Sequence, residues 1–274
     1  MFDTEHNRVS IPFRYRIVLN WSWTSLRSPV YRRTMTEQMT ALITGANKGI
    51  GYETAAGLGR LGWNVGIGAR DQRRRDATVA KLRSEGIDAF AVPLDVTDDE
   101  SVKAAAKQLS DGRGLDALVN NAAIAGGPPV PPTATVLDVV RAVVETNVLG
   151  VVRVTNSMLP ILRRSTAPRI VNMSSSVGSL ALQSNPDVQL GVGDLAYTAS
   201  KTFLNAVTVQ YANELSGSGI LVNAACPGYV ATELNGFSGF RTPGEAAAIA
   251  IRLATLANDG PSGGFFNDDG VVPW

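Results

Sequence analysis

The chain has 274 residues, of which 45% are hydrophobic and 18% charged, and its formal net charge is +1. This is the profile of an ordinary soluble globular protein with room for one large core, and its near-neutral charge gives no reason to expect nucleic acid or an anionic membrane as a partner. A single histidine, His6, and a single cysteine, Cys226, argue against a disulfide framework, a Ser-His-Asp triad or a histidine metal cluster. No apolar run reaches the roughly 18 residues of a membrane span, so we expect a cytoplasmic protein without a metal.

Residues 1–38 differ in composition from the rest of the chain. They hold six arginines and no acidic residue between positions 5 and 37. We expect an extension from an upstream start codon or a disordered arm, and an organelle-targeting peptide or a basic contact arm is the alternative. Met35 and Met39 stand just ahead of the first predicted strand, so we expect the fold to begin at about Met39.

The pattern that organises the chain is an apolar run at 40–44, a turn with Gly45, Gly49 and Gly51, and a helix-like run at 52–61. A strand, a glycine turn and a helix in this order build a dinucleotide site. Glycine lets the backbone approach a pyrophosphate, and the start of the helix offers free N–H groups. The spacing is Gly-x-x-x-Gly-x-Gly, and no Gly-Lys-Ser/Thr of a Walker loop follows. On these residues alone a glycine turn without a ligand is an equally good interpretation.

Strands and helices alternate through the remainder of the chain. We predict strands at 63–70, 88–95, 115–123, 169–175 and 220–225, and helices at 71–86, 98–110, 135–162, 195–215 and 243–257. Most of the strands are continuous apolar runs, which is typical of a parallel sheet covered by helices on both faces. The predicted fold is therefore α/β, a single Rossmann-type doubly wound parallel sheet in one domain at 39–274. A ligand belongs at the carboxyl ends of its strands.

Three of these elements carry groups that suit proton transfer. Tyr197 and Lys201 are four residues apart on a predicted helix and so share a face, where an ammonium group favours the phenolate and lowers the tyrosine pKa. Ser175 closes a strand at the same crevice, where its hydroxyl can hydrogen-bond a carbonyl oxygen. Asn147 lies within a predicted helix. Taken singly, each residue is better explained as a helix surface, a polar turn or a packed polar side chain.

Taken together, the motifs resemble the short-chain dehydrogenase/reductase family across residues 39–274, and most closely its carbonyl reductase subgroup. The matching stretches are Thr44–Gly51, Asp95–Val96, Asn120–Ala123, Asn147, Met173–Ser175, Tyr197–Lys201 and Pro227–Thr232. The resemblance implies a catalytic tetrad of Asn147, Ser175, Tyr197 and Lys201. Tyr197 would donate the proton in reduction or act as the base in oxidation. Ser175 would hold the carbonyl oxygen, Lys201 would lower the tyrosine pKa and bind the nicotinamide ribose, and Asn147 would hold a water.

The resemblance also implies a nicotinamide cofactor, and charge indicates which one. NAD sites usually place an acid at the end of the second strand, whereas this chain has Ala69 followed by Arg70, with Lys48 in the glycine turn. Two cations suit a 2′-phosphate, so we expect NADP(H), although Asp71 could take the place of the missing acid. The expected cofactor-binding residues are Gly45, Asn47, Lys48, Gly49, Ile50, Gly51, Arg70, Asp95, Val96, Asn121, Ala122, Tyr197, Lys201, Pro227, Gly228, Val230 and Thr232.

The resulting prediction is an NADPH-dependent oxidoreductase that reduces a ketone, aldehyde or quinone carbonyl to an alcohol. The alternatives are an NADP-linked dehydrogenase working in the oxidative direction and a non-catalytic module that senses NADP. The expected partner is a small carbonyl or alcohol substrate, and the chain could form a homo-oligomer. The segment 233–242, with Phe237 and Phe240, should form one wall of the substrate pocket, and the long stretch between Ser175 and Tyr197 should be an added loop beside it.

Overall fold

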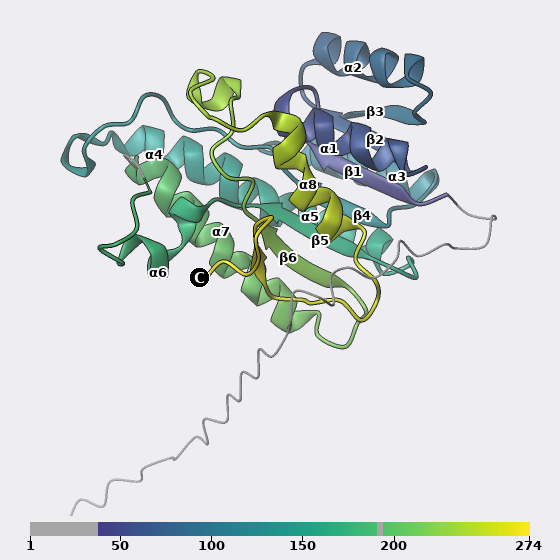
Figure 1. The fold of residues 1–274 in the computed structure, drawn as a ribbon. Coiled ribbons are helices and arrows are strands. Elements are labelled where there is room, and N and C mark those ends of the chain that lie inside the picture. Colours follow the sequence, from purple (N-terminus) through teal and green to yellow (C-terminus); the bar gives the residue numbers. More distant parts are fainter. Residues whose placement is uncertain (1–37, 191–193) are drawn as a thin grey trace, which may run out of the picture.

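The computed structural model describes residues 38–190 and 194–274. Within them a parallel sheet has the strand order β3-β2-β1-β4-β5-β6-β7 (Figure 1). Its strands are β1 (Thr40–Thr44), β2 (Asn64–Ala69), β3 (Ala89–Pro93), β4 (Ala117–Asn120), β5 (Arg169–Met173), β6 (Leu221–Ala225) and β7 (Phe265–Phe266). The main helices are α1 (Gly49–Arg60), α2 (Gln72–Ser84), α3 (Asp99–Asp111), α4 (Leu137–Val144), α5 (Gly150–Leu162), α6 (Leu180–Gln183), α7 (Leu195–Glu214) and α8 (Pro243–Ala254). The predicted doubly wound fold is confirmed.

Both faces of the sheet are buried, which explains why its strands are apolar runs. Alternate residues of β1 point to opposite faces: Ala41 and Ile43 pack with α1, α2 and α8, whereas Leu42 packs with α3, α5 and α7. Figure 1 shows α1 and α8 side by side in front of the sheet. The order of the strands reverses between β1 and β4, so the crevice above their carboxyl ends is the expected binding place.

Two predicted elements differ from the structure in a way that matters for the site. The predicted strand at 115–123 ends at Asn120, because the next amides bond to the Thr44 side chain instead of a strand. The predicted helix at 135–162 is α4 and α5 joined by a π-helical turn, Glu145–Leu149. Such turns bulge one residue out of an α-helix and are frequent at functional sites; this one contains Asn147.

The first part of the stretch between β5 and α7, residues 176–183, folds into two short helical pieces, η4 (Ser176–Gly178) and α6. The end of the chain holds it in place, because the Ala181 amide donates to the Trp274 carbonyl over 2.9 Å. The Trp274 ring in turn stacks on Phe265, with centroids 5.4 Å apart. The loop expected at this place is therefore tied to the edge of the sheet, and the Asp194 side chain caps α7 behind it.

We propose that the folding unit begins at Met39. The predicted extension lies outside the described residues apart from Gln38, whose exposed side chain makes one bond, to the Gly62 carbonyl. The carbonyl of Met39, by contrast, accepts a 2.8 Å bond from Asn64 at the start of β2. A chain that starts at Met39 should keep the melting temperature and the NADPH affinity of the full chain, as measured by thermal unfolding and titration. Loss of soluble protein on this truncation would show that residues 1–38 belong to the fold.

Candidate active site

The glycine turn between β1 and α1 has the shape that a dinucleotide requires. Gly45 and Gly49 have φ values of +65° and +55°, a region that favours glycine. A Cβ on Gly51 would lie 2.5 Å from the Asn121 side-chain nitrogen and 2.7 Å from the Gly45 carbonyl oxygen. The first turn of α1 carries no acidic residue, which leaves its free amides for an anion. The residues present therefore fit a pyrophosphate.

The turn is held from behind by β4. The Thr44 hydroxyl oxygen accepts from the amides of Asn121 and Ala122, both over 2.9 Å. The Asn121 side chain donates back to the carbonyl oxygens of Thr44 and Gly45 over 2.9 and 3.3 Å. The side-chain donors of Asn121 are thus directed at the turn, which makes this residue a support for the glycine turn. Thr44 was not among the predicted site residues; its signal is a polar residue that closes an apolar strand.

The remaining predicted residues of the turn differ in which of their groups make contacts. The Asn47 carbonyl accepts from Thr78 of α2 over 3.3 Å, and the Ile50 carbonyl accepts from Thr54 over 2.8 Å within α1. Both therefore fix the turn through their main chains. Lys48 is the exposed N-cap residue of α1, and its ammonium group forms an ion pair with Glu233.

The end of β2 presents a cation and no free acid. Arg70 is exposed directly after the strand. Asp71, which was the one candidate for the acid of an NAD site, caps α2 by accepting from the Arg74 amide over 2.9 Å. Arg75 is buried and donates to the Ala69 carbonyl over 3.1 Å, so it braces the strand end and does not face the ligand.

Asp95 and Val96 form a tight turn after β3. The Asp95 carboxylate accepts from the Thr97 amide and hydroxyl over 3.0 and 2.7 Å. Burial acts to raise the Asp95 pKa, but these bonds and the charges of Arg70 and Arg153 outweigh it and hold the pKa below its usual value. Arg153 of α5 also donates to the Val96 carbonyl over 2.8 Å. Both predicted residues are therefore locked in position above the sheet.

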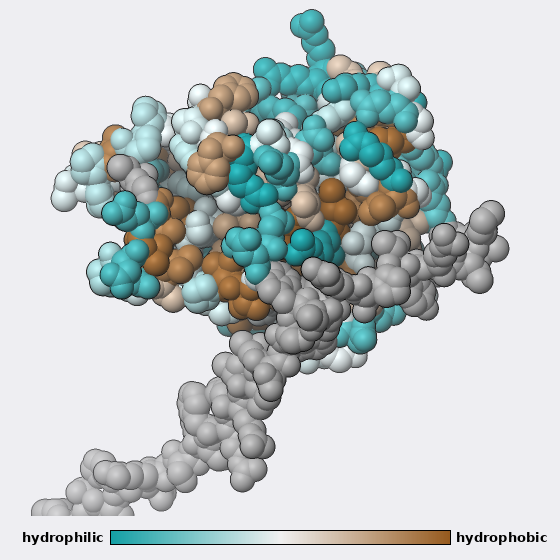
Figure 2. Space-filling view, in the orientation of Figure 1, coloured by the Kyte–Doolittle hydropathy of each residue, from teal (hydrophilic) through white to brown (hydrophobic). Residues whose placement is uncertain are grey.

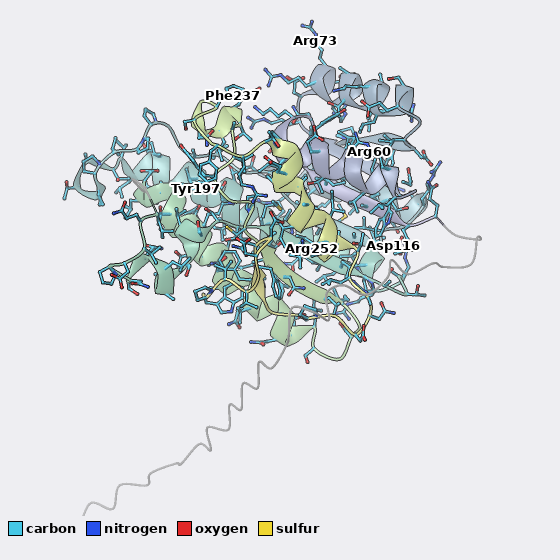
Figure 3. All side chains as sticks on the ribbon, viewed as in Figure 1. Arg60, Arg73, Asp116, Tyr197, Phe237 and Arg252 are labelled. Carbon is cyan, nitrogen blue, oxygen red and sulfur yellow. The ribbon has the colours of Figure 1, made fainter. Side chains whose placement is uncertain are left out.

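Tyr197 and Lys201 of α7 lie beside the carboxyl end of β5, and Ser175 follows this strand in the chain. The Lys201 nitrogen lies 5.4 Å from the centre of the Tyr197 ring and donates to the Met173 carbonyl over 2.7 Å. Lys201 is almost fully buried, with 3% of its surface exposed. Ser175 follows Met173 by two residues, and its hydroxyl accepts from the Val177 amide over 3.4 Å. Lys201 thus joins the Tyr197 ring to the carboxyl end of β5, two residues before Ser175, and Figure 3 labels Tyr197.

The pKa values of this group differ from the expectation. Burial raises the pKa of the Tyr197 phenol above its ordinary value, and it lowers the pKa of the Lys201 ammonium to about 8. The predicted lowering of the tyrosine pKa by Lys201 is therefore wrong for the protein alone. The tyrosine pKa is raised by burial of the phenol and, to a smaller extent, by the charge of the Cys226 thiol. The Lys201 ammonium bonds to the Met173 carbonyl and lies over the ring. The phenol consequently keeps its proton at neutral pH.

Asn147 lies in the π-helical turn and is fully buried. Its side-chain oxygen accepts from the Ile124 amide, and its nitrogen donates to the Ile124 carbonyl, both over 2.9 Å. The same nitrogen donates to the Ser200 hydroxyl over 3.0 Å. The side chain therefore joins the segment after β4 to α7. Its predicted role in holding a water stays a prediction.

The loop after β6 covers the glycine turn. A methyl carbon of Thr232 lies 3.5 Å from where a Cβ on Gly49 would stand. The loop from Pro227 to Thr232 is braced by Arg241, whose guanidinium donates to the Pro227 carbonyl over 2.9 Å and pairs with Asp268. The predicted residues Gly228 and Val230 lie within this braced loop, and Val230 forms a β-bridge with Arg241. Sequence reasoning missed Arg241; its only signal is an arginine just ahead of a helix start.

The segment 233–242, called the lid below, extends from this loop. Its aromatic residues are exposed, Phe237 to 65% and Phe240 to 84%, and the Phe240 ring meets Tyr229 edge-on at 6.1 Å. Figure 3 places Phe237 at the tip of the lid, above Tyr197 in this view, and Figure 2 shows hydrophobic surface at the same spot. The aromatic side chains of the lid thus lie at the surface, and the wall of a substrate pocket at this place stays a prediction.

The fold and this site define an oxidoreductase of the Rossmann type with a nicotinamide dinucleotide as cofactor. Residues 39–239 match the family described as short chain dehydrogenase. The chain belongs to the short-chain dehydrogenase/reductase family. Among the described residues, no group of His, Cys, Asp and Glu is placed to hold a metal ion, and no helix has the length and hydropathy to cross a membrane.

Relatives point to the carbonyl reductase subgroup. Carbonyl reductase [NADPH] 1 of Sus scrofa is 32% identical, covering 85% of this chain and 93% of that protein. The short-chain dehydrogenase anuI of Penicillium roqueforti (strain FM164) is 36% identical over 78% of this chain and 87% of its own length. Among solved structures, the NADPH-bound carbonyl reductase from chicken fatty liver has a TM-score of 0.75 and 31% identity, covering 87% of this chain and all of that one. The predicted resemblance is confirmed.

Proposed function

We propose that this protein is an NADPH-dependent carbonyl reductase that converts a ketone, aldehyde or quinone to an alcohol, with Tyr197 as the proton donor. The observation that carries the proposal is that Lys201 lies over the Tyr197 ring and bonds to the carboxyl end of β5, two residues before Ser175, in a fold whose glycine turn fits a dinucleotide. The names of the relatives, carbonyl reductase [NADPH] among them, support it. The exposed aromatic residues of the lid suit apolar carbonyl compounds.

Bound NADPH supplies the hydride. The Tyr197 phenol is protonated at neutral pH, and burial raises its pKa further. It gives its proton to the substrate oxygen as that oxygen becomes an alkoxide. The Ser175 hydroxyl donates a hydrogen bond to the same oxygen and stabilises its charge. Lys201 uses one of its three N–H donors on Met173, which leaves two for a ribose hydroxyl and for the charge that develops on Tyr197.

A panel of carbonyl compounds tests the proposal. Ketones, aldehydes and quinones with aromatic or aliphatic substituents are offered with NADPH and, separately, with NADH, and the loss of reduced nicotinamide absorbance is followed. We expect turnover of several apolar members and a clear preference for NADPH. An NADP-sensing module would instead bind the cofactor and turn over none of them.

Arg70 should set the choice of cofactor. The exposed guanidinium at the end of β2, with Asp71 committed to capping α2, suits a 2′-phosphate. Arg70→Ala should weaken NADPH binding by about 2 kcal/mol, the typical size of a charge-assisted bond, and leave NADH nearly unchanged. Paired titrations of both cofactors measure this. Arg73→Ala is the matched control, since Arg73 extends into solvent from α2 (Figure 3). Equal losses for both cofactors in Arg70→Ala would mean that Arg70 is structural.

A further inference from the structure

One carboxylate oxygen lies between two cations beside the glycine turn. Glu233 Oε2 forms an ion pair with Lys48 Nζ and lies 3.9 Å from Arg74 Nη1. All three side chains are about half exposed, so ligands can reach them. The hydrogen bond and charge of Lys48 hold the pKa of the Glu233 carboxyl below its usual value, and the group is therefore an anion at neutral pH.

The three residues come from three different segments around the glycine turn. Lys48 belongs to the glycine turn and Arg74 to the first turn of α2, whereas Glu233 opens the lid. Thr232, the residue before Glu233, lies directly over Gly49 of the turn. The ion pair therefore ties the root of the lid to the side of the cleft where β2 ends.

This is the side of the cleft that reads the ribose 2′ position in dinucleotide folds. Carboxylate and phosphate oxygens compete for the same ammonium and guanidinium donors. Asp71 also lies 3.9 Å from Arg74, but its carboxylate is held as the cap of α2. Glu233 lies at the start of a short helical turn in the lid. Its carboxylate caps no helix among the described residues, so it can leave the two cations.

We propose that Glu233 is a specificity-determining residue whose carboxylate competes with the 2′-phosphate of NADP(H) for Lys48 and Arg74. When the phosphate displaces the carboxylate, the lid loses its tie to the cleft. Glu233 thus lowers the affinity for the phosphorylated cofactor and couples its binding to the lid that borders the substrate. The inference rests on the proposed preference for NADP(H).

The test uses adenosine 2′,5′-bisphosphate and AMP as probes, because they differ only in the 2′-phosphate. Calorimetric titration of the full chain should show that Glu233→Gln binds the bisphosphate about two- to fivefold more tightly than the wild type, the range that an exposed ion pair allows. AMP affinity should stay the same. Glu214→Gln, which removes an equal charge from the exposed far end of α7, should change neither.

Each other outcome has a definite meaning. Unchanged or weaker bisphosphate binding by Glu233→Gln, in a protein whose wild type prefers the bisphosphate, overturns this inference and leaves the proposed function intact. Equal tightening of both probes also overturns it, since the effect would then not concern the 2′-phosphate. A wild type that binds both probes equally contradicts the proposed NADP(H) preference, and the inference falls with it.

Hydrogen exchange tests the coupling to the lid. Amides of residues 233–242 should exchange faster in the wild type when the bisphosphate is bound than when AMP is bound. In Glu233→Gln the two probes should give the same exchange. Identical exchange with both probes in the wild type would refute release of the lid.

Discussion

Replacement of Tyr197 by phenylalanine should lower carbonyl reduction by about 10²- to 10⁴-fold, the usual size of general acid catalysis. The variant keeps the aromatic ring over which Lys201 stands and loses only the phenol oxygen, so the fold and NADPH affinity should survive. Steady-state rates at saturating NADPH, together with a cofactor titration, measure both parts of the prediction.

Tyr211→Phe is the matched control for this variant. Tyr211 lies on the same helix, about 20 Å further along its axis, and its hydroxyl donates to Asn156 over 2.7 Å. This change removes a buried hydroxyl without touching the site, so stability should fall slightly and the rate should not. Wild-type reduction rates in Tyr197→Phe would remove Tyr197 as the proton donor, and the mechanism with it.

Replacement of Lys201 by methionine should affect both turnover and cofactor binding. The side chain fills a similar volume but loses the ammonium, so NADPH affinity should fall about tenfold to a hundredfold, as for a lost charge-assisted hydrogen bond. Turnover should fall further, because the charge beside Tyr197 is also gone. Lys107→Met, at an exposed position of α3, is the control and should change neither. A loss of turnover with unchanged NADPH affinity would contradict the contact with the ribose.

The pH dependence of NADPH binding gives a second signature of Lys201. Burial lowers the pKa of this ammonium to about 8, so the group is charged below that pH and neutral above it. NADPH affinity of the wild type should therefore weaken as pH rises through about 8, and affinity of Lys201→Met should stay level over this range. Tyr197 and Cys226 have pKa values raised by burial, which keeps them neutral there. A level profile in the wild type would show that the charge of Lys201 does not assist binding.

The sequence was sufficient to predict the sheet and the end of it at which Ser175, Tyr197 and the glycine turn lie, for a physical reason. Apolar runs that alternate with helical periodicity specify a parallel sheet, and all carboxyl ends of such a sheet lie on one edge. Ser175 after β5 and Tyr197 at the start of α7 must therefore approach the glycine turn. The four-residue spacing of Tyr197 and Lys201 likewise follows from the helix itself.

The hydrogen-bond partners that side chains find through tertiary packing could not be predicted from the sequence. The spacing of Tyr197 and Lys201 does not reveal that the ammonium bonds to the Met173 carbonyl, so the direction of the tyrosine pKa was wrongly predicted. Nothing local indicates that Asn147 joins Ile124 to Ser200 within a π-helical turn. The contact between Glu233 and Lys48 joins residues 185 positions apart. The hydrophobic periodicity of the sequence does not indicate such a pairing.

The most direct measurement of the central claim uses NADPH that carries deuterium at the transferable position of the nicotinamide. Products of the carbonyl panel are analysed by mass spectrometry after reaction with the wild type and with Tyr197→Phe. The account predicts alcohols that carry one deuterium on the former carbonyl carbon in the wild-type reaction, and yields at least about a hundredfold lower with the variant at equal time. Reduction by the variant at the wild-type rate, or no deuterated alcohol from any member of the panel, would contradict it.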